Sequence, residues 1–437
     1  MKTTMQPHTV LLQKFSRLLP EKELNRLAIE SGFMVRRARK LTPLNFVVSF
    51  FLALSQGHTS LSGWVNQLFV LCGALLSKQG LNGRLTKEAS RFVQKVFEEL
   101  LHQRCRIPKE VGRVLKNFSS VLVQDSSAFG LKEGLREQFK GNVSKGVEKA
   151  VMRLKAIVEL CTLRLLEVKV TCYRENDQSA ASNLHKFLHA SVLVVRDLGY
   201  WSLDSFGKII RRGAYFLSRY KWGVALYTPS GEELPLSALL NGRVHDRWVR
   251  LSKAHPLAVR LVIVPVPSRV AEQRIRKAKH NRDRRLNHSE AYYRSLACDI
   301  FVTNVGAQLC TARELQGLYS LRWQIEVLFR ALKSGAVNLQ EMLQPIKKNA
   351  ARVRSVVLLA MCFVALALQE LYERFQQRIL EAADRWLSLI KVLNWLMTNL
   401  LLFACLRKED LERVLVAYCC YEKRKRECLP QKLQRLT

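Results

Sequence analysis

Short apolar runs that alternate with helical segments between residues 119 and 220 constrain the fold of this chain more than any other feature. Two of the runs, SSVLVQD (119–125) and SVLVVRD (191–197), have the length and composition of buried strands, and each ends in an aspartate. A Gly-containing turn, SSAFGL, is expected directly after Asp125. The other segments have hairpin, helix, helix and strand character, at 155–172, 178–190, 198–213 and 214–220 respectively. This order predicts an α/β sheet that carries Asp125 and Asp197 at the ends of two strands.

Helical segments flank this predicted sheet on both sides. Residues 1–116 have helical periodicity, and residues 346–437 are apolar and periodic until a basic tail begins at Lys423. The longest apolar run, SVVLLAMCFVALAL at 355–368, is shorter than the roughly 20 residues that a membrane-spanning helix needs, so we expect a buried helix. The first residues, MKTTMQPHTV, lack the apolar segment of a secretory signal, and we expect none.

Residues 221–296 interrupt the alternation. They contain strand-like runs such as 260–265, followed by the segment RIRKAKHNRDRR at 274–285, which holds seven Lys and Arg against one Asp. We interpret this region as a β-rich insertion with a basic arm, and the arm fits either contact with DNA phosphates or a solvated segment. Residues 297–303 are strand-like again and would return the chain to the sheet.

The charge of the chain is strongly unbalanced. It has 71 Lys and Arg against 36 Asp and Glu, a formal net charge of +35. Self-repulsion of this size indicates a polyanionic partner, although a ribosome-associated or membrane-surface protein would also fit. The basic run RRARK at 36–40 fits either DNA contact or a solvated linker.

Other common sites have no motif support. The 11 cysteines include no C-x-x-C pair, which favours reduced thiols rather than a disulfide framework. The chain has neither a GxxxxGK[ST] loop nor an HExxH motif, so nothing in it indicates ATP use or zinc-dependent hydrolysis.

The segment TARELQGLYSLRWQIEVLFRALKSG at 311–335 reads as one helix with both ends marked. Thr311 and Glu314 have capping-box spacing, and Gly335 suits a left-handed residue just past the end. An apolar stripe recurs at steps of 3 and 4, at Leu318, Leu321, Ile325, Leu328 and Leu332. A polar set recurs at steps of 3, 4 and 7, at Tyr319, Arg322, Glu326 and Lys333. On one helix the polar set would span an arc of roughly 60° beside the stripe.

The spacing Y-x2-R-x3-E-x6-K resembles the signature of DDE-type insertion-sequence transposases, specifically the fourth insertion-sequence family. VLVQDSSAFGL around Asp125 resembles the first-Asp strand of that family, and VVRDLGYWSLDSFGKIIRRGAYFLSRY around Asp197 resembles its second-Asp strand, helix and following strand. The resemblance implies four regions: an N-terminal helical DNA-binding region at 1–116, a ribonuclease-H-like catalytic core at 117–220 and 297–345, a β-rich insertion at 221–296, and a C-terminal helical region at 346–437 that serves dimerisation or caps the core.

The same resemblance implies roles for the marked residues. Asp125, Asp197 and Glu326 would be the catalytic carboxylates that hold two Mg²⁺ ions, for which Mn²⁺ can substitute. Two such ions about 3.5–4 Å apart can clamp the attacking and leaving oxygens of a phosphoryl transfer, and Mg²⁺ prefers carboxylate oxygens. The DNA-binding residues near the cut would be Tyr319, Arg322 and Lys333.

The expected activity is therefore cut-and-paste DNA transposition. The enzyme would hydrolyse the 3′ strands at terminal inverted repeats and join them to target DNA, as a homodimer that pairs two ends. We expect it in the bacterial cytoplasm, at the nucleoid, with no membrane partner. A non-catalytic nucleic-acid-binding derivative and a metal-dependent nuclease without strand transfer are the two alternatives, and inverted repeats flanking the gene would argue against both.

Overall fold

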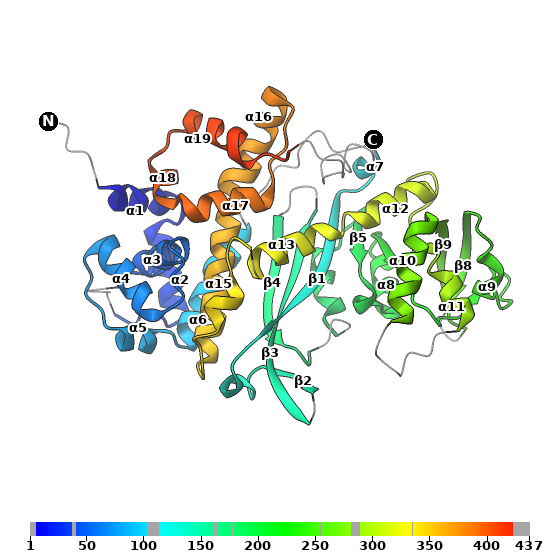
Figure 1. Cartoon of the computed structure of the whole chain (residues 1–437), viewed down its shortest axis with the longest axis horizontal. Coiled ribbons are helices and arrows are strands. Elements are labelled where there is room, and N and C mark those ends of the chain that lie inside the picture. The colour runs from blue at the N-terminus through cyan, green and yellow to red at the C-terminus, as the bar shows by residue number, and fades with distance from the viewer. Residues whose placement is uncertain are drawn as a thin grey trace.

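A computed structural model describes residues 6–36, 41–102, 113–144, 146–160, 164–175, 179–253, 256–280, 289–333 and 335–422. A large mixed sheet runs through the centre of the molecule, and the helices of the N- and C-terminal regions pack together beside its β1–β4 half (Figure 1). The expected mixed α/β class with helical flanks is confirmed.

The described strands form one ten-stranded sheet, in the order β2-β3-β1-β5-β6-β10-β9-β8-β7, with β4 also paired to β3. The strands are β1 (Ser120–Gly130), β2 (Lys140–Ser144), β3 (Val147–Glu159), β4 (Arg164–Cys172), β5 (Val192–Arg196), β6 (Tyr215–Arg219), β7 (Leu226–Tyr227), β8 (His245–Leu251), β9 (Leu257–Pro265) and β10 (Cys298–Thr303). Strand β1 pairs antiparallel with β3 and parallel with β5, and β5 pairs parallel with β6. Parallel neighbours need a crossover, and helix α8 (Leu203–Arg211) supplies it between β5 and β6.

Strand β1 is longer than the sequence predicts. The prediction ends the strand at Asp125 and places a turn after it, whereas β1 continues to Gly130 and Asp125 lies opposite Ala156 of β3. The prediction is wrong because the polar residues after Asp125 resemble a turn locally, while the long partner β3 supplies the backbone hydrogen bonds of a strand. Asp197 directly follows β5, as predicted.

Alternation along the central strands divides their side chains between two cores. Val121 and Val123 of β1 and Val195 of β5 belong to the larger core, which also includes helices of both flanks. Leu122 and Val194 point to the opposite face and belong to a smaller core with α8. Residues of β1 that are an even number of positions from Val123 therefore face the larger core.

Helices make up both flanks. Before the sheet they are α1 (Pro7–Leu18), α2 (Glu21–Glu30), α3 (Pro43–Ser55), α4 (Leu61–Cys72), α5 (Lys78–Arg84), α6 (Lys87–His102) and α7 (Arg113–Lys116). After residue 367 they are η4 (Leu368–Glu373), α16 (Arg374–Ala383), α17 (Leu389–Thr398), α18 (Leu400–Cys405), α19 (Lys408–Val414) and η5 (Leu415–Cys419). The eight cysteines in the described residues are free thiols, as expected. Residues 37–40 of the RRARK run and the basic tail from Lys423 lie outside the described residues.

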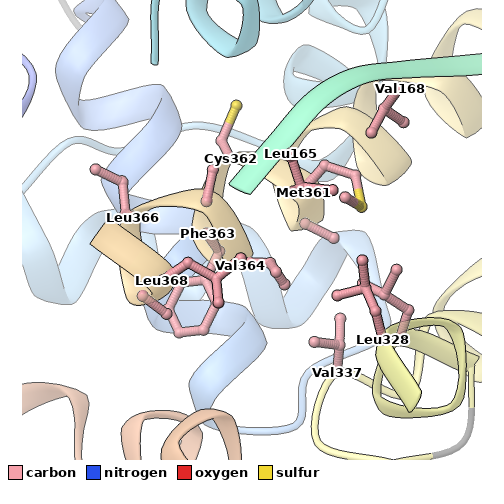
Figure 2. Packing of buried hydrophobic residues seen from close by; sticks show 14 of the residues in the cluster. Leu165, Val168, Leu328, Val337, Met361, Cys362, Phe363, Val364, Leu366 and Leu368 are labelled. Atoms are coloured by element: carbon pink, nitrogen blue, oxygen red, sulfur yellow. The ribbon is translucent and has the colours of Figure 1, made fainter. Parts of the chain in front are cut away.

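Helix α15 (Ala350–Ala367) is the central packing element of the larger core. Figure 2 shows its residues Met361 and Phe363 among side chains from β4 and from the helix that carries Leu328. The continuous helical stretch Ala350–Ala383 is long and apolar enough to cross a membrane, but 83% of its most apolar window is buried inside the protein. Burial of that extent is typical of a core helix, which agrees with the sequence prediction.

The segment 311–335 is two helices rather than one. Helix α12 (Ala312–Ser320) begins with the predicted capping box of Thr311 and Glu314. The helix stops at Leu321–Arg322 and resumes as α13 (Trp323–Lys333). The apolar stripe in the sequence does not reveal this break, because Leu318, Leu321 and Ile325 are all buried although the helix is interrupted between them.

The prediction for Gly335 is also wrong, since its φ is not positive. A Cβ added there would lie 2.9 Å from Ala331 Cα, so glycine permits a close approach of the chain to α13. At α8, Asp204 lies in the first turn and is not the cap. The cap is Ser202, whose side chain accepts a hydrogen bond from the Ser205 amide.

The region 221–296 is mixed rather than β-rich. Its strands β7, β8 and β9 extend the central sheet beyond β10, and it also contains α9 (Leu236–Leu239), α10 (Ser268–Lys279) and α11 (Glu290–Ser295). The first part of the predicted basic arm belongs to α10, where Arg274 pairs with Asp299 over 2.8 Å. The rest of the arm, from residue 281, lies outside the described residues.

Candidate active site

The two aspartates meet because β1 and β5 are parallel neighbours. Gln124 of β1 pairs with Arg196 of β5. Asp125 and Asp197 each lie one residue further along these two neighbouring segments. Asp125 lies two residues after Val123, and Asp197 lies two residues after Val195, so alternation places both on the face of the larger core. The strand register thus brings together two residues that are far apart in the sequence.

Arg322, at the break between α12 and α13, lies among the three predicted carboxylates. Its Nη1 donates to Asp125 Oδ2 over 3.1 Å, and its Nη2 donates to Glu326 Oε1 over 2.7 Å. Its Nε is 4.0 Å from Asp197 Oδ1. The Arg322 side chain is only 15% exposed, so these interactions are shielded from solvent more than those of a surface ion pair.

The break in the 311–335 segment orients Arg322 and Glu326 toward the aspartates. Glu326 lies in the first turn of α13, where a carboxylate interacts favourably with the helix dipole. Ile325 and Leu328 bury the opposite side of α13 in the larger core. This packing fixes the orientation of α13 and leaves the Glu326 side chain 29% exposed beside β1.

Tyr319 is largely buried at the end of α12. Its ring packs on Phe301 of β10, with centroids 5.2 Å apart, and its hydroxyl donates to Asp197 Oδ1 over 3.4 Å. Burial, with a smaller contribution from the Asp197 charge, raises the pKa of Tyr319 to about 12. The phenol is therefore a neutral hydrogen-bond donor at neutral pH.

The carboxylates line an open pocket of about 460 Å³, and Arg322 and Lys333 line it with them. Lys333 Nζ lies 5.5 Å from the centroid of the Phe129 ring. The structure therefore brings five of the six predicted site residues to one pocket, and Tyr319 touches that site through Asp197.

Sequence reasoning missed part of the lining. Ser126 and Ser127 of β1 and Phe329 and Arg330 of α13 also line the pocket. The i,i+4 step from Glu326 to Arg330 is a signal that was available in the sequence. The wrong prediction of a turn after Asp125 left the two serines off the strand that lines the pocket.

Asp125 titrates abnormally. Burial raises the pKa of its carboxyl to about 6, although the Ser126 amide and the Arg322 charge both oppose this rise. The nearby Asp197 and Glu326 charges act in the same direction as burial. Carboxylates that repel one another in a partly desolvated pocket are typical of functional sites.

Two buried charge clusters position α12, and no local sequence pattern predicts either of them. Arg260 of β9 forms a bidentate pair with Asp246 of β8, both contacts 2.6 Å, and donates to the carbonyl oxygens of Val305 and Cys310 just before α12. Gln316 of α12 is held separately, because its amide donates to Asp299 Oδ2 over 2.7 Å.

The donor set fits a hard divalent cation, because it consists of three carboxylates around an open pocket. Their arrangement differs from a preformed metal cage. In the described residues no group of three or more His, Cys, Asp or Glu side chains is spaced to hold a metal. The three carboxylates converge on the Arg322 guanidinium instead, so binding a metal between them requires that side chain to move.

Comparisons with known proteins identify the family and several relatives of this chain. The family model described as "Transposase DDE domain" matches residues 116–363. The chain is 26% identical over 352 residues to the transposase for insertion sequence element IS231B of Bacillus thuringiensis, covering 74% of this chain and 73% of that protein. It is 24% identical over 337 residues to the transposase for IS1151 of Clostridium perfringens, covering 71% of each. A cryo-EM structure of the piggyBac transposase synaptic complex with hairpin DNA aligns with a TM-score of 0.45 and 9% identity, covering 98% of this chain and 88% of that one.

Proposed function

Because this chain belongs to the family described as the transposase DDE domain, and is a DNA transposase of the insertion-sequence type, we propose that Asp125, Asp197 and Glu326 are its catalytic carboxylates. One observation carries the proposal: the three acids come from β1, the end of β5 and α13, yet all lie within 4.0 Å of the Arg322 guanidinium. Surface acids have no reason to converge in this way, whereas a phosphoryl-transfer site needs them together.

The cofactor of this family is a divalent metal ion, and we propose two Mg²⁺ ions held by the three acids, with Mn²⁺ able to substitute. Bound there, the ions would stabilise the charge that develops on the transferred phosphate. The contribution of the chain is to position carboxylate oxygens on a rigid sheet and a packed helix. Asp125 must lose its proton to act as a ligand, and it does so above a pH of about 6.

DNA is the partner, and we propose that Arg322, Lys333 and Tyr319 contact its backbone next to the cut. Arg322 changes role in this account. In the protein alone its guanidinium neutralises the carboxylates, and when a DNA strand enters the pocket it turns to a phosphate, which accepts the same bidentate geometry. Arg330 lines the same pocket and adds a further cation for the strand.

We propose the cut-and-paste reaction of an insertion sequence. Water attacks the phosphodiester at the 3′ end of the transposon strand, the freed 3′-OH then attacks a phosphodiester of target DNA, and one P–O bond forms as one breaks in each step. A homodimer would hold two ends together. We expect the protein to act on DNA in the bacterial cytoplasm, at the nucleoid.

The strand order supports a ribonuclease-H-like core. In the path β4-β3-β1-β5-β6, the first three strands are antiparallel neighbours, and β5 and β6 run parallel to β1. Asp125 lies on β1, and Asp197 lies at the end of β5. We assign this core to residues 117–220 and 297–345, DNA binding to the helices of 1–116, and dimerisation to 346–437. The region 221–296 enlarges the sheet at the other edge.

The deciding experiment uses a DNA fragment that carries the gene with its own flanks. Wild-type protein and Glu326→Gln would be incubated with it, with and without Mg²⁺, and new 3′ ends would be mapped. We expect discrete ends at an inverted repeat that require both Mg²⁺ and Glu326, while Glu326→Gln still binds the fragment. Cleavage at a normal rate by Glu326→Gln would refute the site assignment.

The product pattern separates the remaining functions. Joining of the new 3′ ends to a second DNA molecule is expected of a transposase. Discrete cuts without joining would indicate a nuclease, and tight binding without any cut would indicate a non-catalytic derivative.

A further inference from the structure

A second concave surface, with no acid in its lining, lies between the N-terminal helices and the start of α15. It has a volume of about 1040 Å³, more than twice that of the carboxylate pocket, and shares no residue with it. Its walls are the end of α5, the first turns of α6, residue 138 before β2, and residues 348–354. We call it the α6–α15 groove.

The lining of the α6–α15 groove is cationic. Lys87, Arg91, Lys348 and Arg354 line it, whereas no Asp or Glu of the described ranges does. Arg91 pairs with Glu88 of its own helix over 2.7 Å. Lys87 and Lys348 are exposed, and neither has an ion-pair partner within the part of the chain that the structure describes. The groove therefore presents positive charge that the protein does not neutralise.

Arg354 is a half-buried cation that has no carboxylate partner among the described residues. Its Nη1 donates to the Val170 carbonyl oxygen over 2.8 Å, and its guanidinium lies 5.2 Å from the centroid of the Phe139 ring. Burial lowers the pKa of Arg354, and no carboxylate contributes to that shift. A desolvated charge that is held in place but unpaired is costly unless a ligand supplies the opposite charge.

Two helix N-termini add positive potential in the same place. Helices α6 and α15 both begin there, so the positive ends of both dipoles meet, while Thr86 Oγ1 accepts from the Ala89 amide of α6. Asn349 fixes the two walls to each other, since its side-chain amide donates to the Leu85 carbonyl oxygen over 3.1 Å and its Oδ1 caps α15. This hydrogen bond fixes the positions of the two walls relative to each other.

From these features we propose that the α6–α15 groove binds the phosphodiester backbone of duplex DNA, as a second contact away from the cut. The proposal rests on the proposed transposase function for the identity of the anion. A repeating phosphate backbone fits a surface with several cations and two helix N-termini better than a single small anion does. The short helix α14 (Leu339–Leu343) joins Lys333 in the pocket to Lys348 in the groove, so one segment would connect the two contacts.

The test measures DNA binding by the full-length protein as a function of salt, with a duplex that carries the gene's own flank and with a duplex of unrelated sequence. The variant is Lys87→Ala with Lys348→Ala. Each lost phosphate contact should reduce the slope of log K against log salt by about 1, so we expect a slope shallower by about 2. Both lysines are exposed, so the variant should fold, which its melting temperature verifies.

The matched control is Lys408→Ala with Arg413→Ala, which removes two exposed cations of α19, outside the groove and outside the helices of 1–116. We expect its slope to equal that of wild type. A reduced slope on both duplexes supports general backbone binding in the groove, and a reduced slope on the flank alone supports binding of the transposon end. An unchanged slope on both duplexes, in a protein that still cuts its flank, would refute DNA binding in the groove and leave the transposase assignment intact.

Discussion

Arg322 Nη1 donates to Asp125 Oδ2 over 3.1 Å, and this contact joins the turn between α12 and α13 to the middle of β1. The same guanidinium also reaches Glu326 and Asp197. In the protein alone, a side chain of the signature therefore occupies the space between the carboxylates. In the proposed mechanism, metal binding and DNA binding are coupled, because both depend on the position of the Arg322 guanidinium.

We expect Arg322→Met to bind Mn²⁺ more tightly than wild type in the absence of DNA. The gain should be about tenfold or more, since two positive charges a few ångströms apart repel by more than roughly 1.4 kcal/mol near a protein surface. Titration calorimetry of the DNA-free protein measures it. Arg330→Met is the control, because Arg330 lines the pocket but makes no ion pair in the described residues. Equal affinities for Arg322→Met and wild type would contradict the account of Arg322.

Lys333→Ala should weaken binding of flank DNA and make its salt dependence shallower by about 1, as the loss of one phosphate contact does. The side chain lies over Phe129 at the rim of the pocket, so its removal leaves the core unchanged. Anisotropy titrations over a range of salt give the slope. Lys408→Ala removes the same charge from α19 and should leave the slope unchanged. If the two variants behave alike, Lys333 has no phosphate partner.

The abnormal pKa of Asp125 predicts a pH-dependent effect of Asp125→Asn on stability. The folded pKa of about 6 exceeds the ordinary value of 3.8, so the folded state binds more protons between these values and wild type loses stability as the pH rises through this window. Asparagine stays neutral, so the free energy of unfolding of the variant relative to wild type should increase from pH 4 to pH 6 and then level off.

Urea unfolding of Asp125→Asn and wild type at several pH values measures this difference. Asp204→Asn provides a control of opposite sign. A hydrogen bond from Lys208 lowers the pKa of the exposed Asp204, so this variant should lose a small amount of stability at neutral pH and recover it below the ordinary pKa. A pH-independent difference for Asp125→Asn would show that burial does not perturb this carboxyl.

The Asp246–Arg260 pair predicts an asymmetry between single and double variants. Asp246→Ala leaves the Arg260 guanidinium buried without its carboxylate and should cost on the order of 3 kcal/mol of unfolding free energy. Replacing both residues, with Asp246→Ala and Arg260→Met, should cost less, because no buried charge remains. Urea unfolding of the four proteins in the cycle gives the coupling, and additive effects would argue against the pair as the anchor of α12.

The sequence by itself predicted the mixed α/β class and the helical flanks, and it singled out the residues that meet at the candidate site. It could do so because these depend on local information: the apolar period of each segment, the capping box at Thr311, and the spacing from Tyr319 to Lys333 on neighbouring helical turns. The buried character of α15 also followed from its composition and length. Each of these features is encoded within about twenty consecutive residues.

Only the tertiary structure decided how these parts meet. The strand β1 extends through Asp125 because β3 pairs with it, and the 311–335 segment breaks at Arg322, where the guanidinium reaches acids from two strands. The anchors Arg260 and Asp299 and the groove between α6 and α15 likewise join residues far apart in the chain. Such features depend on strand register and on packing between distant elements, and local periodicity carries no information about either.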